Sequence, residues 1–306
     1  MRIPMLIPFS CAMKDKRTAL LFGANGQDGH YLTQYLETMN IQVVGVSRSG
    51  DFLRTQLSAF EEVSALIKQI QPDYIIHLAA NSTTRHDAMM ENHETISTGT
   101  LHILEATRLH ASHAKVFISG SGLQFQNNGT PIRETDPFEA RDAYSVSRIQ
   151  SVYAARYFRT LGVQAYVGYF FNHDSPRRSE RHMAQKIAAA ARRIANGSEE
   201  TLVVGDASVV KEWTYAGDVV KAIWLLMNQT EVFEANLGSG LGYSIQDWID
   251  RCFAIIGKDP SRHVQIDTSF KAEYRSLISD ASLIKQLGFN PTVGFDQLAK
   301  MMMHDA

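Results

Sequence analysis

The chain has 306 residues, of which 44% are hydrophobic and 20% are charged, and its formal net charge is −2. This is ordinary globular composition, and the length suffices for one large α/β domain that carries a smaller lobe. The nearly neutral charge gives no reason to expect nucleic acid or an anionic membrane as a partner, and no stretch has the roughly 18 apolar residues that a membrane span needs.

The first 13 residues form a short apolar leader. No small-residue cleavage site ends it, and Lys14, Lys16 and Arg17 follow it, whereas a signal peptide carries its positive charges before the apolar run. We therefore expect a non-native or disordered leader. Only two cysteines, Cys11 and Cys252, are present, so no disulfide framework is expected and a cytoplasmic location fits best.

The stretch from Thr18 to Tyr31 organises the rest of the chain. A short apolar run, residues 19–22, reads as a buried parallel strand, and a glycine-rich turn and a helical pattern follow it. A second strand is expected at 43–46, the distance typical of a βαβ unit. The alternative is a tight turn before a surface helix, but these flanks favour a dinucleotide phosphate site. Its candidate residues are Gly23, Asn25, Gly26, Gln27, Asp28 and Gly29.

The glycine spacing, G-x-x-G-x-x-G, resembles the version found in short-chain dehydrogenase/reductases. The second strand ends in Ser47-Arg48-Ser49, with no acidic residue placed for the adenosine ribose hydroxyls. An arginine there suits a 2′-phosphate through charge-assisted hydrogen bonds, although it could also be a solvated strand-end residue. NADP is therefore the predicted cofactor, in preference to NAD.

Further elements follow in the order of a doubly wound α/β fold. Helical spacing covers residues 60–70, a buried strand runs over 74–80, a second long helix spans 96–109, and a strand at 116–122 leads to the expected chemistry. His77 lies in an apolar run and is interpreted as a core histidine. The end of the third strand resembles the segment that passes the cofactor phosphates in extended short-chain enzymes, which makes Leu78, Ala79 and Ala80 cofactor-site candidates.

Three segments resemble the GDP-mannose 4,6-dehydratase family: residues 26–29, residues 134–138 and above all residues 171–178, FNHDSPRR. The similarity runs from about Lys16 to the C-terminal helix. We expect a doubly wound parallel (Rossmann) sheet with a smaller, split α/β substrate lobe. Residues 14–171 and 203–235 would form the NADP-binding domain, and residues 172–202 and 236–306 the lobe.

The resemblance implies a nucleotide-sugar enzyme in which bound NADP takes a hydride from sugar C4, water leaves from C6, and the hydride returns to C6. Tyr144 is the candidate base, and Arg148 stands where the family has a lysine. Ungapped registration places Gly120 at the position of the hydroxyl that polarises C4–O and Gly122 at that of a glutamate. Glycine can do neither job, so Ser119 and Ser121 become the candidate hydroxyl donors.

These changes leave alternatives open. A 4-keto-6-deoxy-sugar reductase or an epimerase needs no glutamate for elimination, and a non-catalytic NADP or nucleotide-sugar binding protein would need none of the changed groups. The resemblance assigns substrate contacts to Asn172, Lys186, Lys211 and Glu273, with Phe270 at an arginine position. The expected partner is a nucleotide-sugar, GDP-linked, without a metal. Homodimers or homotetramers are expected, with dimers formed through the helices near Leu101 and Tyr144.

Overall fold

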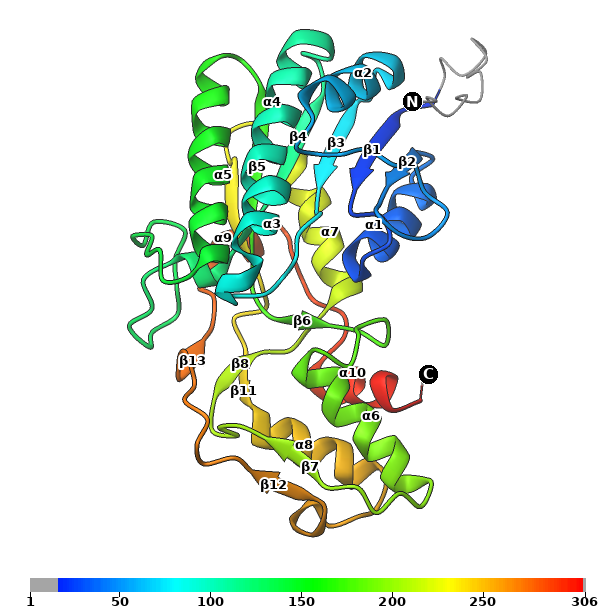
Figure 1. Ribbon diagram of the computed structural model, residues 1–306, viewed down its shortest axis with the longest axis vertical. Coiled ribbons are helices and arrows are strands. Elements are labelled where there is room, and N and C mark those ends of the chain that lie inside the picture. Colours follow the sequence, from blue (N-terminus) through cyan, green and yellow to red (C-terminus); the bar gives the residue numbers. More distant parts are fainter. Residues whose placement is uncertain (1–15, 305–306) are drawn as a thin grey trace.

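The computed structural model describes residues 16–304, and the leader predicted for residues 1–13 lies outside the described residues. Its centre is a six-stranded parallel sheet with the order β10-β5-β4-β3-β1-β2 (Figure 1). The strands are β1 (Thr18–Phe22), β2 (Gln42–Val46), β3 (Tyr74–His77), β4 (Lys115–Ser121), β5 (Gln164–Phe170) and β10 (Glu234–Leu237).

Side chains along each strand alternate between two hydrophobic layers, as expected for a sheet that helices cover on both faces. In β1, Leu20 and Phe22 pack against one set of helices, whereas Ala19 and Leu21 pack against the other. The first set comprises α2 (Phe60–Ile70), α4 (Gly99–His110) and α5 (Ala143–Thr160), and the second comprises α1 (Gln27–Thr38), α7 (Ala216–Met227) and α9 (Ser282–Gln286). This arrangement confirms the predicted doubly wound parallel sheet.

Strand β1 lies between β2 and β3, so the strand order reverses at β1. Such a reversal opens a crevice at the carboxyl ends of the strands, which is where open α/β sheets bind ligands. Strands β1 and β3 point toward the lower part of the molecule in Figure 1. The segment between β3 and α4 contains α3 (Met89–Asn92) and a π-helical stretch, His93–Thr98, so the long helix predicted over 96–109 begins with wider turns.

The lower part has its own hydrophobic core, in which the indole rings of Trp213 and Trp248 stack with centroids 4.6 Å apart. The hydroxyl of Ser244 caps the helix Ile245–Ile255 by accepting from the backbone N–H of Asp247 at 3.0 Å. The elements of this lower part are β6 (His173–Asp174), α6 (Met183–Ala195), β7 (Leu202–Val204), β8 (Val210–Glu212), β9 (Thr214–Tyr215), β11 (Gly242–Ser244), α8 (Ile245–Ile255), β12 (Val264–Ile266), β13 (Ser276–Leu277) and α10 (Phe295–His304).

None of the helices within residues 16–304 has the length and apolar character that crossing a bilayer requires.

Candidate functional site

The glycine turn after β1 is shaped for close approach of a ligand. Gly23 has a φ of +92°, and a β-carbon there would lie 2.7 Å from the backbone nitrogen of Ala79. A β-carbon at Gly29 would lie 2.5 Å from the carbonyl oxygen of Gly23, so α1 packs tightly on the turn. The first turn of α1 has no side-chain cap at Gly26. Its free N–H groups and the helix dipole therefore suit a phosphate.

The two residues that open α1 also bind the FNHDSPRR segment. The hydroxyl of Ser175 donates to Oε1 of Gln27 at 2.7 Å, and Nε2 of His173 lies 2.9 Å from Oδ1 of Asp28. The Nδ1 atom of His173 lies 2.7 Å from the carbonyl oxygen of Phe171. Both ring nitrogens thus face oxygens that only accept hydrogen bonds, an arrangement that the doubly protonated imidazolium satisfies completely.

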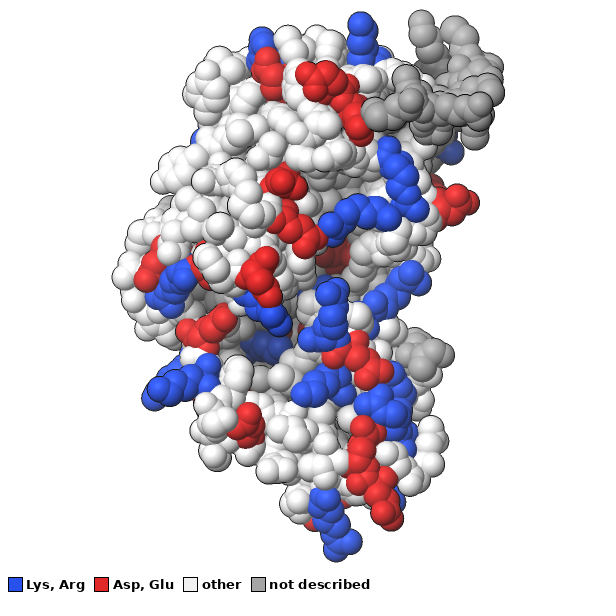
Figure 2. All heavy atoms as spheres, in the orientation of Figure 1, with Lys and Arg blue, Asp and Glu red and all other residues white. Residues whose placement is uncertain are grey.

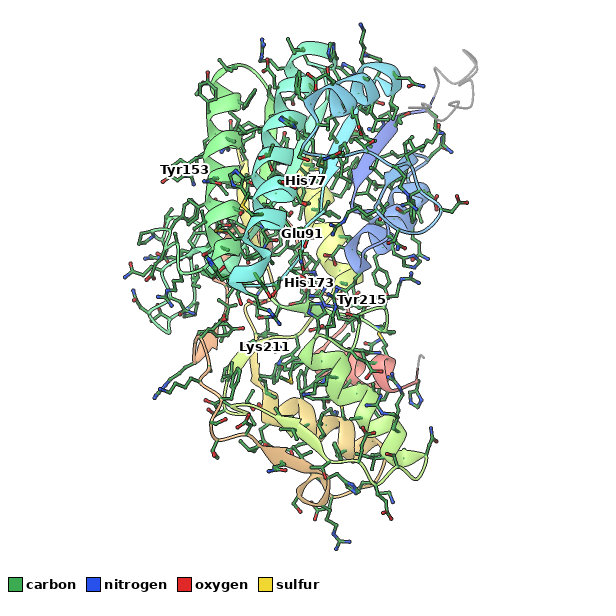
Figure 3. The ribbon with its side chains drawn as sticks, viewed as in Figure 1. His77, Glu91, Tyr153, His173, Lys211 and Tyr215 are labelled. Carbon is green, nitrogen blue, oxygen red and sulfur yellow. The ribbon has the colours of Figure 1, made fainter. Side chains whose placement is uncertain are left out.

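The charges of this pair support the same conclusion. Burial acts to raise the pKa of Asp28, but the charge and hydrogen bond of His173, together with Arg178, lower it to about 2. Burial acts to lower the pKa of His173, but Asp28 outweighs it and the pKa is raised above its ordinary value. The glycine turn and the FNHDSPRR segment are therefore joined by a largely buried ion pair, of which Figure 3 labels His173.

A cavity of about 810 Å³ opens on the β2 side of the glycine turn. Arg48 lines it, as predicted for a 2′-phosphate contact, but here its Nη1 atom lies 2.6 Å from Oε1 of Glu91. Arg54, which the sequence analysis missed, lines the same cavity and donates to the carbonyl oxygens of Ser47 and Gly50. Two guanidinium groups thus flank this end of the crevice. Leu78, Ala79 and Ala80 line its opposite wall.

The tyrosine and arginine of α5 meet the end of β4. The side chain of Asp142 caps α5 by accepting from the backbone N–H of Tyr144 and Ser145, which fixes the start of the helix. The guanidinium carbon of Arg148 lies 5.0 Å from the centre of the Tyr144 ring, and both residues line a second cavity of about 480 Å³. The structure therefore brings Tyr144 and Arg148 together in the crevice.

Arg148 is buried and already engaged on one side. Its Nη1 atom donates to the carbonyl oxygen of Ser119 and, at 2.6 Å, to the hydroxyl of the same residue. That hydroxyl in turn donates to the carbonyl oxygen of His77 at 2.9 Å. Ser119 is therefore a structural partner of Arg148. The Nε atom of Arg148 is buried and has no hydrogen-bond partner among the described residues, so a bound ligand could satisfy it.

His77 is fully buried, in agreement with its interpretation as a core residue. Burial and the charge of Arg148 lower its pKa to about 3, so the imidazole is neutral. Nε2 lies 3.1 Å from the carbonyl oxygen of Thr95, and Nδ1 has no partner in the described part of the chain. His77 is therefore a neutral, buried core residue, and one of its two ring nitrogens has a hydrogen-bond partner among the described residues.

Ser121 is the hydroxyl that remains for chemistry. Its oxygen accepts from the backbone N–H of Leu123 at 3.2 Å and lines the 480 Å³ cavity, and within residues 16–304 its hydrogen has no acceptor. Gly120 faces away from that cavity, since a β-carbon there would lie 2.6 Å from the ring of Tyr169. A β-carbon at Gly122 would lie 2.8 Å from the ring of Phe171. Aromatic rings thus take the space beside both glycines.

Cations gather on the opposite side of this cavity. Arg177, Arg178 and Arg181 supply these cations, with His182 beside them, and Figure 2 shows Lys and Arg side chains around the hollow between the two halves. Burial and the positive charges of Arg178, Arg181 and Lys211 lower the pKa of His182 to about 4, although Asp174 opposes them. The positive potential makes this wall suitable for a diphosphate.

The predicted substrate residues are not all brought together. Asn172 lines the cavity, and its buried Oδ1 has no partner among the residues described. Lys186 is half-buried and donates to the carbonyl oxygen of Val203, outside the residues that line the crevice. Lys211 is buried behind the cavity, with Nζ 4.5 Å from the centre of the Trp213 ring. The structure therefore does not place either lysine at the phosphate wall.

Glu273 lies farther out, where it accepts from the hydroxyl of Thr84 at 3.0 Å and lines a cavity of about 140 Å³. Phe270, at the arginine position, is 54% exposed and covers Gly205. The basic residues at the phosphate wall, Arg177, Arg178 and Arg181, come within six residues after the FNHDS sequence. The clustering of these arginines is visible in the sequence, but the direction in which their side chains point is not.

Comparison with known proteins gives a consistent result. The family described as GDP-mannose 4,6 dehydratase matches residues 49–302. The chain is 30% identical to GDP-mannose 4,6 dehydratase 2 of Arabidopsis thaliana over 329 aligned residues, covering 97% of this chain and 88% of that protein. It is 26% identical to the human GDP-mannose 4,6 dehydratase, covering 95% and 91%.

Solved structures share the fold. RMD from Pseudomonas aeruginosa complexed with NADPH superposes with a TM-score of 0.82 at 22% identity, covering 95% of this chain and 98% of that one. MoeE5 in complex with UDP-glucuronic acid and NAD gives a TM-score of 0.83 at 20% identity, covering 94% and 97%. These two proteins bind different dinucleotides on the same architecture, so the fold alone does not select between NAD and NADP.

Proposed function

The chain belongs to the GDP-mannose 4,6-dehydratase family, and on this premise we propose that it uses NADP to exchange a hydride at C4 of a GDP-linked sugar. The observation that carries the proposal is the meeting of three groups at one crevice. The glycine turn, the arginines of residues 177–181, and Tyr144 with Arg148 all line the cavity of about 480 Å³.

The residues present fit a nicotinamide dinucleotide. A β-carbon at Gly23 would overlap the backbone of Ala79 and one at Gly29 would overlap that of Gly23, so only glycine allows this compact turn, and the N-terminus of α1 has no side-chain cap at Gly26. Arg48 and Arg54 supply two guanidinium groups for a 2′-phosphate, which supports NADP over NAD. When bound, the nicotinamide supplies hydride acceptance and return.

The chain's own groups then handle the proton and the substrate. Tyr144 takes the proton of the sugar C4 hydroxyl, and the guanidinium of Arg148 supplies a fixed positive charge beside that phenol. Ser121 donates its free hydroxyl hydrogen to O4. Arg177, Arg178 and Arg181 hold the diphosphate, and Asn172 presents its unpaired amide oxygen to the ligand.

One observation favours a second reaction. A carboxylate at position 122 would be needed for elimination, but the ring of Phe171 lies where that side chain would begin. Reduction or epimerisation of a 4-keto-6-deoxy sugar uses the same tyrosine, arginine and serine without this carboxylate. The remaining alternative is a non-catalytic homologue that only binds NADP or the nucleotide-sugar.

Mass spectrometry separates these functions. The purified protein is analysed for bound NADP and then incubated with GDP-mannose and NADP. Loss of one water from the sugar establishes dehydration. An unchanged sugar, with turnover of a GDP-4-keto-6-deoxy hexose in the presence of NADPH, establishes a reductase. Bound NADP without turnover of either sugar identifies the binding homologue, and failure to bind any dinucleotide refutes the proposal.

A homodimer is the expected assembly. Leu101 on α4 and Val146, Tyr153 and Tyr157 on α5 are exposed, and Figure 3 shows Tyr153 projecting away from the molecule. Val146, Tyr153 and Tyr157 recur at helical spacing and form one face. An exposed apolar face of this kind supports pairing of two subunits, and light scattering would measure the mass in solution.

A further inference from the structure

A chain of polar contacts crosses the crevice directly above the glycine turn. Arg48 follows β2, Asn81 follows β3, and β1 lies between these two strands. Glu91 of α3 joins them, because its Oε1 atom lies 2.6 Å from Nη1 of Arg48 and its Oε2 atom accepts from Nδ2 of Asn81 at 2.8 Å. We call these three side chains, Arg48, Glu91 and Asn81, the clasp.

The clasp belongs to the adenosine end of the crevice. Arg48 and Glu91 line the 810 Å³ cavity together with Gly26 of the glycine turn, and Figure 3 shows Glu91 just past the end of β3. A dinucleotide whose phosphates reach the N-terminus of α1 therefore passes the clasp. The Glu91 carboxylate binds Nη1 of Arg48, a guanidinium donor that a 2′-phosphate would also use, and both groups are anions.

We propose that Glu91 is a specificity-determining residue, which holds Arg48 in the absence of a 2′-phosphate and is displaced from it when NADP binds. This inference rests on the proposed use of NADP. Binding of NAD, which has no 2′-phosphate, leaves the ion pair between Arg48 and Glu91 intact. The carboxylate therefore weakens NADP binding and leaves NAD binding unchanged, so the enzyme's preference for NADP is smaller than its two guanidinium groups alone would give.

The exposure of the pair limits the size of the effect. The side chain of Arg48 is 72% exposed and that of Glu91 is 38% exposed, and ion pairs between solvated groups are weak. Releasing Arg48 should tighten NADP binding by about two- to fivefold. If the carboxylate instead bound the ribose hydroxyls of NAD, its removal would weaken NAD binding rather than strengthen NADP binding.

The test uses the full chain and the variant Glu91→Gln, which keeps the shape and removes the charge. Glu105→Gln is the matched control, because Glu105 forms an ion pair of similar exposure with Arg108 on α4 and lines neither cavity. Dissociation constants for NADP and for NAD are measured by isothermal titration calorimetry, and thermal unfolding verifies that each variant is folded.

The expected result is an NADP dissociation constant about two- to fivefold lower in Glu91→Gln, with NAD within about twofold of the parent and no change in Glu105→Gln. The inference is overturned if Glu91→Gln binds NADP as the parent does, if it binds NAD more weakly, or if both variants gain the same affinity for NADP. In each of these cases the parent still binds NADP, so the proposed function stands. Parent protein that binds neither dinucleotide refutes the proposed function and the inference with it.

Discussion

The ion pair between Asp28 and His173 provides a sharp test of how the cofactor turn is joined to the FNHDSPRR segment. We predict that Asp28→Asn destabilises the fold by about 2 kcal/mol near pH 5.5. The magnitude follows from the pKa of Asp28, which is lowered from 3.8 to about 2, at about 1.4 kcal/mol for each pKa unit. His173 would also lose the anion that faces its Nε2 atom.

The pH dependence has a defined sign. Because the folded-state pKa of Asp28 is depressed, its contribution is present above about pH 3.8 and is lost as the pH falls toward about 2. Because the folded-state pKa of His173 is raised, its contribution is present below about pH 6.5 and is lost as the pH rises through the folded value. The variant should therefore differ most from the parent between about pH 4 and 6.5.

Urea unfolding of both proteins at several pH values measures this difference. Asp51→Asn is the control, because Asp51 is exposed and lies in the loop after β2. Removal of its charge should change the free energy of unfolding by less than about 0.5 kcal/mol. If Asp28→Asn matched the parent near pH 5.5, or if its deficit were the same at about pH 3, the buried ion pair would not exist as described.

Three further predictions concern the sheet and the chemistry. Glu234→Gln should lower the free energy of unfolding by about 3 kcal/mol at neutral pH, as measured by urea unfolding. Hydrogen bonds from Arg156 and other neighbours outweigh burial and lower the pKa of Glu234 to about 2. The difference from the parent should therefore shrink as the pH falls below about 4.5. Gly120→Ala should lower stability by about 1–3 kcal/mol in the same assay, since its β-carbon would overlap the Tyr169 ring. Tyr144→Phe should lower kcat by about 10²- to 10⁴-fold on the sugar identified by mass spectrometry, with NADP affinity changed little.

Much of the fold was predictable because its signals are local. The apolar run before Gly23, the strand expected at 43–46 and the helical spacing of residues 60–70 all correspond to elements of the structure. Each pattern depends only on side-chain periodicity and turn chemistry within a few residues. The glycine turn was predictable for the same reason, because backbone approach to a phosphate dictates glycine at fixed positions.

The candidate site was harder to predict because it depends on directions in space. Lys186 and Lys211 are cations in suitable segments, but one bonds a carbonyl outside the crevice and the other packs behind it. Arg54 and Glu91 reach the adenosine end from a loop and a short helix, and no periodic pattern indicates that. Arg148 was identified by its spacing from Tyr144, although its bond to the Ser119 backbone could not be inferred.

The two glycines at the end of β4 have different meanings in three dimensions. Gly120 faces the Tyr169 ring, so a hydroxyl introduced there would not enter the cavity, whereas Ser121 already presents one. Gly122 faces Phe171, so a glutamate could be accommodated only if that ring moved. Under the proposed function, Ser121 supplies the hydroxyl that Gly120 lacks, whereas the ring of Phe171 takes the space of a carboxylate at position 122. Hydride exchange at C4 requires only the first function, so this structure supports oxidation and reduction at the sugar more directly than elimination of water.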